Sequence, residues 1–189
     1  WGIGTLGWSL CLSAMLHADT ETVEQSPDIV LIVADDLGWG DLDRHGNPVH
    51  QTPNLDRMED DGATMLHHFT APDGAPAQSN LLTGRHFLRT GVSDDVEAAH
   101  ILHHAEITVA EVLHDHGYRC GFFGNWMMGQ NFPHHPAGQG FQTWDLEADP
   151  VAAALRFLQE ERTDPALAVV WLSAPGRPRN PDSLQDSVE

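Results

Sequence analysis

The segment Ile29–Ala34 reads Ile-Val-Leu-Ile-Val-Ala, and it constrains the fold more than any other part of the sequence. A continuous run of β-branched and aliphatic residues is typical of a strand buried on both faces, as in a parallel sheet. Asp35 and Asp36 follow at its carboxyl end, where open α/β sheets bind their ligands. The sequence therefore predicts a strand of a parallel sheet that is buried on both faces and has a polar site at its carboxyl end.

Strand and helix signals alternate along the rest of the chain. Glycine, proline and capping residues set the expected boundaries. The expected elements are a helix from Asn54 to Gly62, a strand over 64–70, a loop over 71–78, a helix starting in 79–82, a helix over 108–116, a strand over 119–123, a loop over 129–140, a helix over 150–158 and a strand over 167–172. This alternation predicts an α/β fold with a mainly parallel central sheet flanked by helices.

The charge of the chain excludes several classes of partner. The 189 residues include 9 arginines and no lysine against 28 acidic residues, a formal net charge of −19. Such a surface repels phosphate backbones and anionic lipids, so we expect neither nucleic-acid nor membrane-surface binding. The two cysteines, Cys11 and Cys120, allow at most one disulfide and exclude a cysteine-based zinc site.

The two ends of the chain differ in composition from its middle. Residues 1–18 are uncharged apart from His17 and end in the small residue Ala18. This pattern indicates what is left of a secretory signal peptide, and hence a secreted or periplasmic protein without any other membrane segment; a buried apolar strand is the alternative. We expect a polar spacer over 19–27, a folded domain over 28–178 and a flexible tail over 179–189.

Several motifs occur in a fixed order within this domain. They are Ile29 to Asp41 (IVLIVADDLGWGD), Gly46 to Arg57 (GNPVHQTPNLDR), Leu81 to Arg85 (LLTGR), Arg89 to Val92 (RTGV) and Thr108 to Gly124 (TVAEVLHDHGYRCGFFG). Together they resemble the sulfatase family of the alkaline-phosphatase superfamily. Any one motif alone would be weak, but their agreement in order and spacing is specific.

The resemblance implies an α/β sandwich that hydrolyses sulfate esters. In the family, a cysteine converted to formylglycine supplies the nucleophile, a divalent cation, usually calcium, polarises the sulfate, and Arg, Lys and His side chains hold the sulfate oxygens. Asp35 and Asp36 match the paired metal carboxylates of the family. Calcium takes roughly 6–8 oxygen ligands, so this pair alone is an incomplete site.

The motif that carries the nucleophile departs from the family pattern. The family has Cys-x-Pro-Ser-Arg, and this chain has Gly74-Ala75-Pro76-Ala77-Gln78. Gly74 stands at the cysteine position, so formylglycine cannot form there, and Gln78 replaces the arginine. Ser79 and Asp73 lie nearby but out of register.

Further charged positions are also replaced. The family motif Gly-Lys-Trp-His-Leu-Gly becomes Gly124-Asn125-Trp126-Met127-Met128-Gly129, and Gly176 replaces the histidine of a looser Ala-Pro-His match. Asn125 and Met127 thus stand in for the sulfate-binding lysine and the histidine. Arg89 matches the Arg-Thr-Gly-Val turn of the family, where arginine can pair with carboxylates of the pocket. A structural ion pair is favoured over a catalytic role for this residue.

These replacements predict a sulfatase-family protein that is a catalytically inactive pseudoenzyme or fragment. Two alternatives stay open: an active sulfatase or phosphodiesterase-type hydrolase with an unorthodox nucleophile, and a binding module for sulfated glycans. The resemblance covers the N-terminal half of the family domain, so the chain is expected to be truncated. It is either a fragment of something longer or associates with a partner chain that covers its sheet edge.

The 13 histidines suggest a metal site less strongly than their number implies. His100, His103 and His104 would share one face of a helix, a spacing that can bind zinc or nickel. The favoured interpretation is that these histidines occupy solvated positions on the polar surface of a chain without lysine. His86 lies close to the expected pocket, and the sequence assigns it no role.

Overall fold

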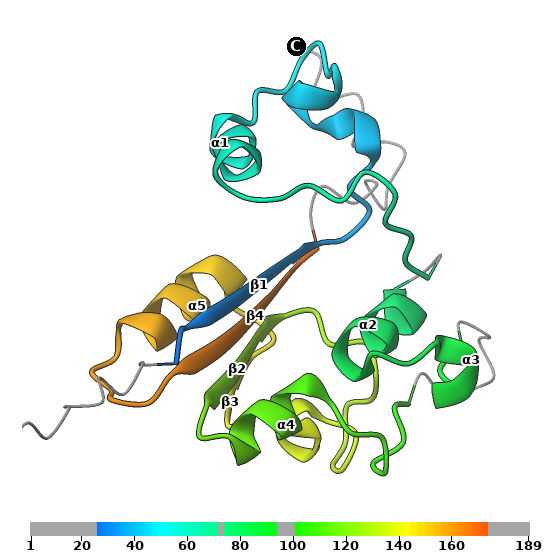
Figure 1. Cartoon of the computed structure of the whole chain (residues 1–189). Helices are drawn as coiled ribbons and strands as arrows, with labels where there is room; N and C mark the ends of the chain where they lie inside the picture. The colour runs from blue at the N-terminus through cyan, green and yellow to red at the C-terminus, as the bar shows by residue number, and fades with distance from the viewer. Residues whose placement is uncertain (1–25, 72–73, 94–100, 174–189) are drawn as a thin grey trace, which may run out of the picture.

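The computed structural model describes residues 26–71, 74–93 and 101–173. It forms a four-stranded sheet with helices on both faces (Figure 1). The elements in chain order are β1 (Ile29–Ala34), α1 (Pro53–Asp61), α2 (Gly74–Thr83), α3 (Phe87–Thr90), α4 (Val109–Asp115), β2 (Arg119–Gly124), β3 (Thr143–Asp145), α5 (Pro150–Gln159) and β4 (Ala166–Leu172). Short 3₁₀ turns lie at η1 (Trp39–Asp41), η2 (Asp43–His45) and η3 (Pro136–Gln139).

The sheet has the strand order β1-β4-β2-β3, and all three pairings are parallel. Leu167 of β4 pairs with Ile29 of β1 on one side and with Cys120 of β2 on the other. All carboxyl ends therefore meet at one edge of the sheet. The predicted α/β class with a parallel sheet is confirmed, and the predicted buried strand 167–172 lies in its interior.

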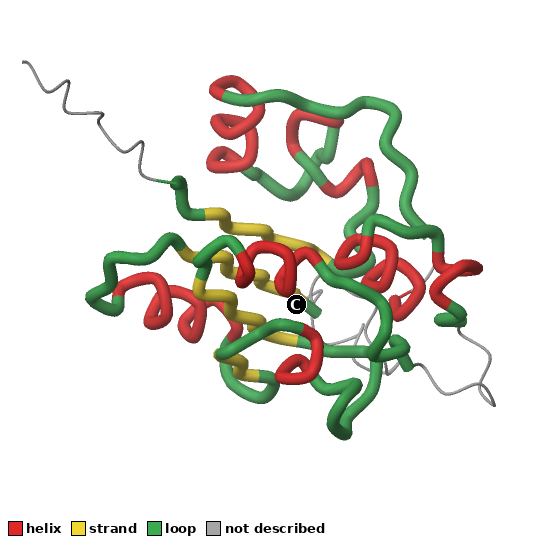
Figure 2. The backbone as a smooth tube through the Cα atoms, turned by 60° about the horizontal axis from the view of Figure 1, so that its bottom comes forward, coloured by secondary structure: helices red, strands yellow, loops and turns green. Residues whose placement is uncertain are grey.

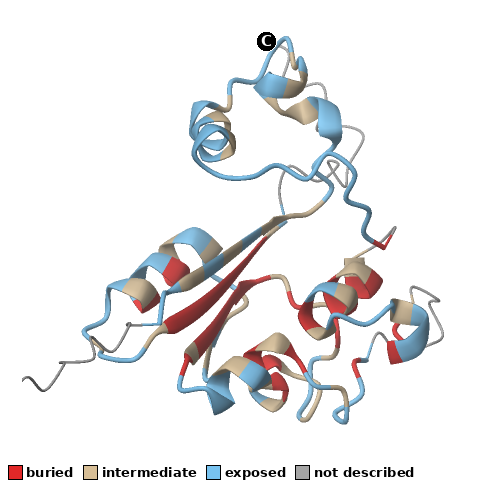
Figure 3. Ribbon diagram, in the orientation of Figure 1, coloured by how far each residue is buried: buried red, intermediate tan, exposed pale blue. Residues whose placement is uncertain are grey.

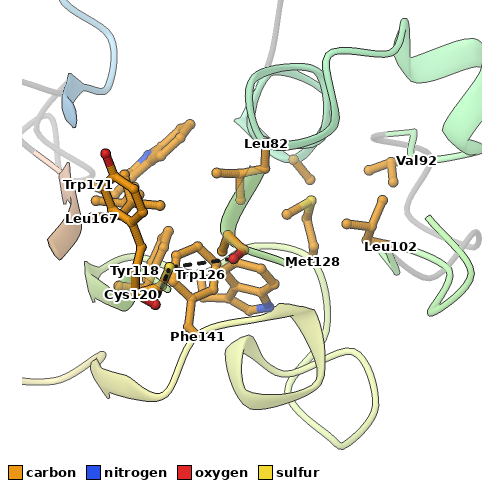
Figure 4. Packing of buried hydrophobic residues seen from close by; sticks show 14 residues of the cluster. Leu82, Val92, Leu102, Tyr118, Cys120, Trp126, Met128, Phe141, Leu167 and Trp171 are labelled. Carbon is orange, nitrogen blue, oxygen red and sulfur yellow. Dashed lines mark hydrogen bonds between the residues drawn. The ribbon is translucent and has the colours of Figure 1, made fainter. Parts of the chain in front are cut away.

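Side chains of β4 alternate between two apolar layers, as the period of two in a strand requires. Leu167, Val169 and Trp171 face α2 and α4, whereas Ala166, Ala168 and Val170 face α5. Phe122, Trp126 and Phe141 pack together in the first layer at ring-centroid distances of 5.0 to 6.1 Å. Figure 4 shows Trp126 beside Phe141. Figures 1 and 2 show α5 on one side of the sheet, α2 and α4 on the other, and α1 beyond the carboxyl end of β1.

The predicted helices α1, α4 and α5 are confirmed, and two of them begin as their capping residues indicate. The Thr108 hydroxyl accepts from the Glu111 N–H at 3.2 Å, and the Glu111 carboxylate accepts from the Thr108 N–H at 2.8 Å. Asp149 accepts from the backbone of Val151 and Ala152 at the start of α5. Such caps satisfy donors that a helix start leaves open.

Three predictions of local structure are wrong. The strand β1, predicted to be buried on both faces, is an outer strand of the described sheet and exposes Val30 and Ile32, because no described element covers these side chains. Residues 64–70 form no strand: every one is exposed and none pairs with the sheet, so nothing there supports a ladder. Residues 74–78, predicted as loop, form the first half of α2. Pro76 sits in the first helical turn, where its missing N–H leaves no bond unmade, and the flanking alanines favour a helix. The short elements α3 and β3 lie where no element was predicted.

Residues 37–70, which we call the lobe, lie beyond the carboxyl end of β1 and contain no buried residue (Figures 1 and 3). Local contacts hold the lobe together: Arg44 pairs with Glu59 and Asp60, and Trp39 stacks on His45 at 3.6 Å. Large apolar side chains remain open to solvent, including Val49, Met65 and Phe69. The sheet body, by contrast, buries two clusters of apolar side chains, although Val30 and Ile32 of β1 stay exposed.

Candidate functional site

A pocket of about 440 Å³ opens at the carboxyl ends of β1 and β4. Its walls are the end of β1, the face of α2 that carries Gly74 and Ala77, and the last part of the lobe. The polar side chains that line it are those of Asp35, Asp36, His68 and Thr70. We call it the aspartate pocket. The fold thus brings the two sequence-predicted aspartates to the same cavity as Gly74, which the resemblance aligns with the cysteine of the family.

Asp35 and Asp36 form a turn directly after β1. The Asp35 N–H donates to the Leu172 carbonyl at 2.9 Å, which extends the pairing of β1 with β4 by one residue. Asp36 then adopts a φ of 57°, a left-handed conformation that aspartate tolerates better than most side chains. Asp35 is half-buried and Asp36 is exposed. The turn therefore presents both carboxylates at the sheet edge.

The donor set of this turn does not fit a calcium ion. Calcium takes roughly 6–8 oxygen ligands, and two carboxylates from adjacent residues supply only part of such a shell. Across the described residues, no group of three or more His, Cys, Asp or Glu side chains converges as a metal site. We therefore derive no chemical step through calcium.

A side chain at position 74 would have to displace the thioether of Met127 from its place in this arrangement. A β-carbon placed on Gly74 would lie 2.7 Å from the Met127 Sδ and 3.3 Å from its Cε. Distances below 3.0 Å are shorter than a carbon–sulfur contact allows. The thioether of Met127 therefore fills the space that a nucleophile at position 74 would occupy.

Gln78 ties the same two segments together through its amide. The side chain is fully buried. Its Nε2 donates to the Asn125 carbonyl at 2.9 Å, and its Oε1 accepts from the Met127 N–H at 2.8 Å. An arginine could donate to the carbonyl but has no acceptor for the N–H. The glutamine is therefore fitted to hold the backbone of residues 125–127 against α2.

The four replaced positions Gly74, Gln78, Asn125 and Met127 are thus neighbours, although two lie on α2 and two follow β2. Each supplies a neutral group where the resemblance implies a thiol or a charge. The arginines that form ion pairs among the described residues do so away from the pocket: Arg44, Arg85, Arg119, Arg156 and Arg162. Neither a thiol nor an arginine is among the side chains described as lining the pocket.

Other sequence candidates lie elsewhere. Arg89 is exposed on α3, and no carboxylate of the described residues pairs with it. The buried Ser79 hydroxyl bonds to the Pro76 carbonyl at 2.9 Å and to Thr90 at 3.2 Å, so it is held within the core. His86 caps α3 and stacks on Phe87. Gly176 and Asp73 lie outside the described residues.

Two further groups give no catalytic candidate. His103 and His104 lie in a turn and stack on each other, so the predicted helical face does not form there, and His100 lies outside the described residues. Cys120 is fully buried, and its thiol donates to the Ala110 carbonyl at 3.4 Å. Burial raises the pKa of Cys120 to about 11, which disfavours the reactive thiolate.

Sequence reasoning missed three features of this edge of the sheet. The contact between Gly74 and Met127 joins residues 53 positions apart, and no local pattern announces it. His68 and Thr70 reach the aspartate pocket from a segment expected to be a strand. Trp144 lines a second pocket beyond β2 and β3; its position in a short alternating stretch is the one signal that could have placed it on a strand.

No helix in the described ranges combines the length and the apolar character that a membrane crossing requires.

Comparison with known proteins identifies the family whose motifs the sequence carries. The model of the Sulfatase family matches residues 27–178. Arylsulfatase G of Canis lupus familiaris is 40% identical over 124 residues, which cover 64% of this chain and 23% of that protein. Arylsulfatase D of Homo sapiens is 38% identical over 130 residues, 61% of this chain and 22% of that protein.

Solved structures share the fold. Ps i-CgsB in complex with k-i-k-neocarrahexaose has a TM-score of 0.66 at 20% identity and covers 82% of this chain and 46% of its own. BT4656 in complex with its substrate D-glucosamine-2-N,6-O-disulfate has a TM-score of 0.68 at 18% identity. The match covers 81% of this chain and 35% of the BT4656 chain. The chain spans about a quarter of the length of the curated relatives that it matches. On the family match over most of its length, this chain belongs to the sulfatase family.

Proposed function

We propose that this chain is a non-catalytic member of the sulfatase family, one that does not hydrolyse sulfate esters through the family's formylglycine chemistry. The observation that carries the proposal is the 2.7 Å separation between a β-carbon placed on Gly74 and the Met127 Sδ. A glycine has no side chain to oxidise, and the thioether of Met127 occupies the space beside it. Loss of a nucleophile typically lowers turnover by around 10⁶-fold.

The charge around the pocket supports the same proposal. A sulfate ester carries negative charge that grows on its oxygens during cleavage, so catalysis needs fixed positive partners. Gln78 and Asn125 are neutral, and Asp35 and Asp36 add negative charge at the cavity wall. Loss of one preorganised donor typically costs about 10²–10³ in turnover. The pocket is therefore electrostatically unsuited to holding a sulfate group.

Hydrolysis of 4-nitrophenyl sulfate and 4-nitrophenyl phosphate tests the proposal. We expect no release of 4-nitrophenol above the rate in buffer, measured beside an active arylsulfatase as the positive control. The Asp35→Ala and Thr70→Ala variants are assayed in parallel, because Thr70 is a hydroxyl in the aspartate pocket. Turnover by the natural sequence that either variant abolishes would contradict the proposal and favour a hydrolase with an unorthodox nucleophile.

Binding of sulfated glycans without hydrolysis is the second candidate, and the charge distribution weighs against it. Titration calorimetry with a sulfated oligosaccharide distinguishes the two. We expect no saturable heat at physiological ionic strength. Saturable binding that becomes tighter in Asp35→Ala would instead support a glycan-binding pocket. In that case the carboxylate of Asp35 weakens binding by repelling the sulfate groups.

We also propose that the protein is exported and that another polypeptide covers its sheet edge. The prediction of a cleaved signal concerns residues 1–18, which lie outside the described residues, and N-terminal sequencing of exported protein should begin at Asp19. The outer strand β1 exposes 48% of Val30 and 59% of Ile32, a form of edge that proteins usually protect. Sedimentation of the isolated chain should reveal self-association or a tightly held partner, and a stable lone monomer would contradict the second part.

A further inference from the structure

A second pocket, of about 480 Å³, opens at the carboxyl ends of β2 and β3. The strand β3 ends at Asp145, which pairs with Phe123, and β2 ends one residue later at Gly124. The segment that follows β2 supplies one wall, and Trp144 with the residues after it supplies the other. We call this cavity the Trp144 pocket. It lies on the edge of a parallel sheet where ligands bind in α/β proteins, and the replaced nucleophile position is not part of its lining.

Trp144 gives the pocket a flat apolar surface. The indole is 42% exposed although tryptophan is one of the more buried residue types. Trp144 lies on β3, which is the last strand in the sheet order and pairs with β2. The His135 ring contacts it at a centroid distance of 5.1 Å and an angle of 82°, which restricts its rotation. A held aromatic ring at a pocket wall is a binding surface that loses little entropy when a ligand covers it.

Polar groups surround this ring with both donors and acceptors. The half-buried Asn125 amide and the exposed Glu147 carboxylate line the pocket, and no hydrogen bond or ion pair within the described ranges engages either side chain. Gln130 also lines it, and its Nε2 donates to the Trp126 carbonyl at 3.4 Å. An amide offers two donors and an acceptor, and a carboxylate accepts from adjacent hydroxyls.

The second carboxylate in the pocket is already occupied. Asp145 Oδ1 accepts from the N–H groups of Glu147 and Ala148, at 3.3 and 2.9 Å. Its Oδ2 faces the Arg156 Nη2 at 3.7 Å. Asp145 therefore shapes the turn after β3, and Glu147 is left as the pocket's one ionic group with no partner in the described residues. A single exposed carboxylate contributes little to binding a cation and repels an anion.

From this arrangement we propose that the Trp144 pocket binds an uncharged sugar ring of an oligosaccharide. The apolar C–H face of the ring covers the indole, and its hydroxyl groups donate to Glu147 and exchange hydrogen bonds with Asn125. Small-molecule sites generally combine an apolar wall with a few placed polar groups in this way. Binding requires no nucleophile, so the inference stands apart from the loss of hydrolysis.

Titration calorimetry with hexasaccharides tests the inference. The neutral probes are β-linked hexamers of glucose, galactose and mannose; a heparin hexasaccharide is the anionic probe and a hexamer of glucosamine the cationic one. We expect saturable binding of at least one neutral probe and weaker binding of both charged probes. Failure of all three neutral probes to bind, or preference for the cationic hexamer, would overturn the proposal.

Variants locate the binding to the pocket. Trp144→Ala should weaken binding of the neutral probe about tenfold or more, and Glu147→Gln should weaken it by a smaller factor, whereas Trp144→Phe should retain most of it. Trp39→Ala is the matched control, because Trp39 is 58% exposed and also contacts a histidine ring, but lies in the lobe. Thermal melting checks that each variant is folded. Equal loss in Trp39→Ala, or no loss in a folded Trp144→Ala, would place the binding elsewhere.

Discussion

The two walls of the aspartate pocket differ in how tightly they are built. On one wall, α2 and residues 125–127 are joined by two hydrogen bonds to the buried Gln78 and by the close approach of Met127 to Gly74. On the other wall, Asp35 and Asp36 stand half-buried and exposed on a turn next to the lobe. Neutral, closely packed groups lie on the buried wall, whereas the carboxylates lie where water can solvate them. Contacts within the fold therefore account for Gln78 and Met127 on the first wall.

The largest expected effect is on the buried wall. Gln78→Ala leaves the Asn125 carbonyl and the Met127 N–H without their partner, and each unsatisfied buried group costs about 1–3 kcal/mol. We expect the free energy of unfolding in urea to fall by about 3 kcal/mol. Gln130→Ala is the matched control, because Gln130 is exposed and makes a single bond at 3.4 Å; its effect should stay within about 0.5 kcal/mol. Equal effects would show that Gln78 does not lock this wall.

A smaller effect is expected on the aspartate wall. Asp36 has a φ of 57°, and a β-branched side chain in that conformation costs about 1–2 kcal/mol. Asp36→Val should therefore lower the free energy of unfolding by that amount, while Asp36→Asn should leave it nearly unchanged. A loss as large in Asp36→Asn would mean that the carboxylate charge, rather than the backbone turn, stabilises this wall.

The opposite end of β1 provides a carboxylate that is clearly paired, and its effect should be smaller still. A hydrogen bond from Arg162, followed by one from the Ala166 N–H, lowers the pKa of Asp28 below its usual value of 3.8. A lowered pKa stabilises the fold above the unfolded-state value, and this stabilisation is lost as pH falls through the folded-state pKa. Because the pair is partly exposed, we expect at most about 1 kcal/mol.

Urea unfolding of Asp28→Asn at pH 7 and at pH 3 measures this contribution. The difference between the natural sequence and the variant should be largest at pH 7 and shrink toward pH 3. Asp36→Asn serves as the comparison, because Asp36 follows the carboxyl end of β1 whereas Asp28 precedes its amino end. A pH-independent difference for Asp28→Asn would mean that its ionisation does not contribute.

Calcium should have the smallest effect. Even a site with a dissociation constant of about 1 mM would add only about 0.4 kcal/mol in 1 mM calcium, and the two carboxylates of the turn fall short of a full shell. We expect the melting temperature to be the same in calcium and in chelator. A rise of several degrees that Asp35→Ala removes would show that the aspartate wall still binds metal.

The sequence predicted the sheet body well because its signals are local. The β-branched run at Ile29–Ala34, the Thr108–Glu111 capping box and Pro150 at the start of α5 each determine their own segment. Residues 64–70 carried a similar apolar pattern but have no strand beside them, and burial rather than pattern decides whether such a segment joins a sheet.

The site could be predicted only in part. The family resemblance predicted that Asp35, Gly74 and Gln78 belong to one pocket; the structure places Asp35 and Gly74 in the lining of the aspartate pocket and Gln78 further along α2. The closure of position 74 by Met127 depends on the rotamer of a flexible side chain 53 residues away, which no spacing encodes. The role of Gln78 likewise depends on the backbone that it meets, since its amide serves one donor and one acceptor at once.

The most direct test of the account is a double-mutant cycle between positions 74 and 127, measured by urea unfolding. Gly74→Ala should destabilise the natural sequence by about 1 kcal/mol, since the added methyl group meets the thioether. In the Met127→Ala background the same change should be neutral or stabilising, which gives a coupling energy of about 1 kcal/mol. Additive effects of the two substitutions would contradict the claim that Met127 fills the nucleophile position.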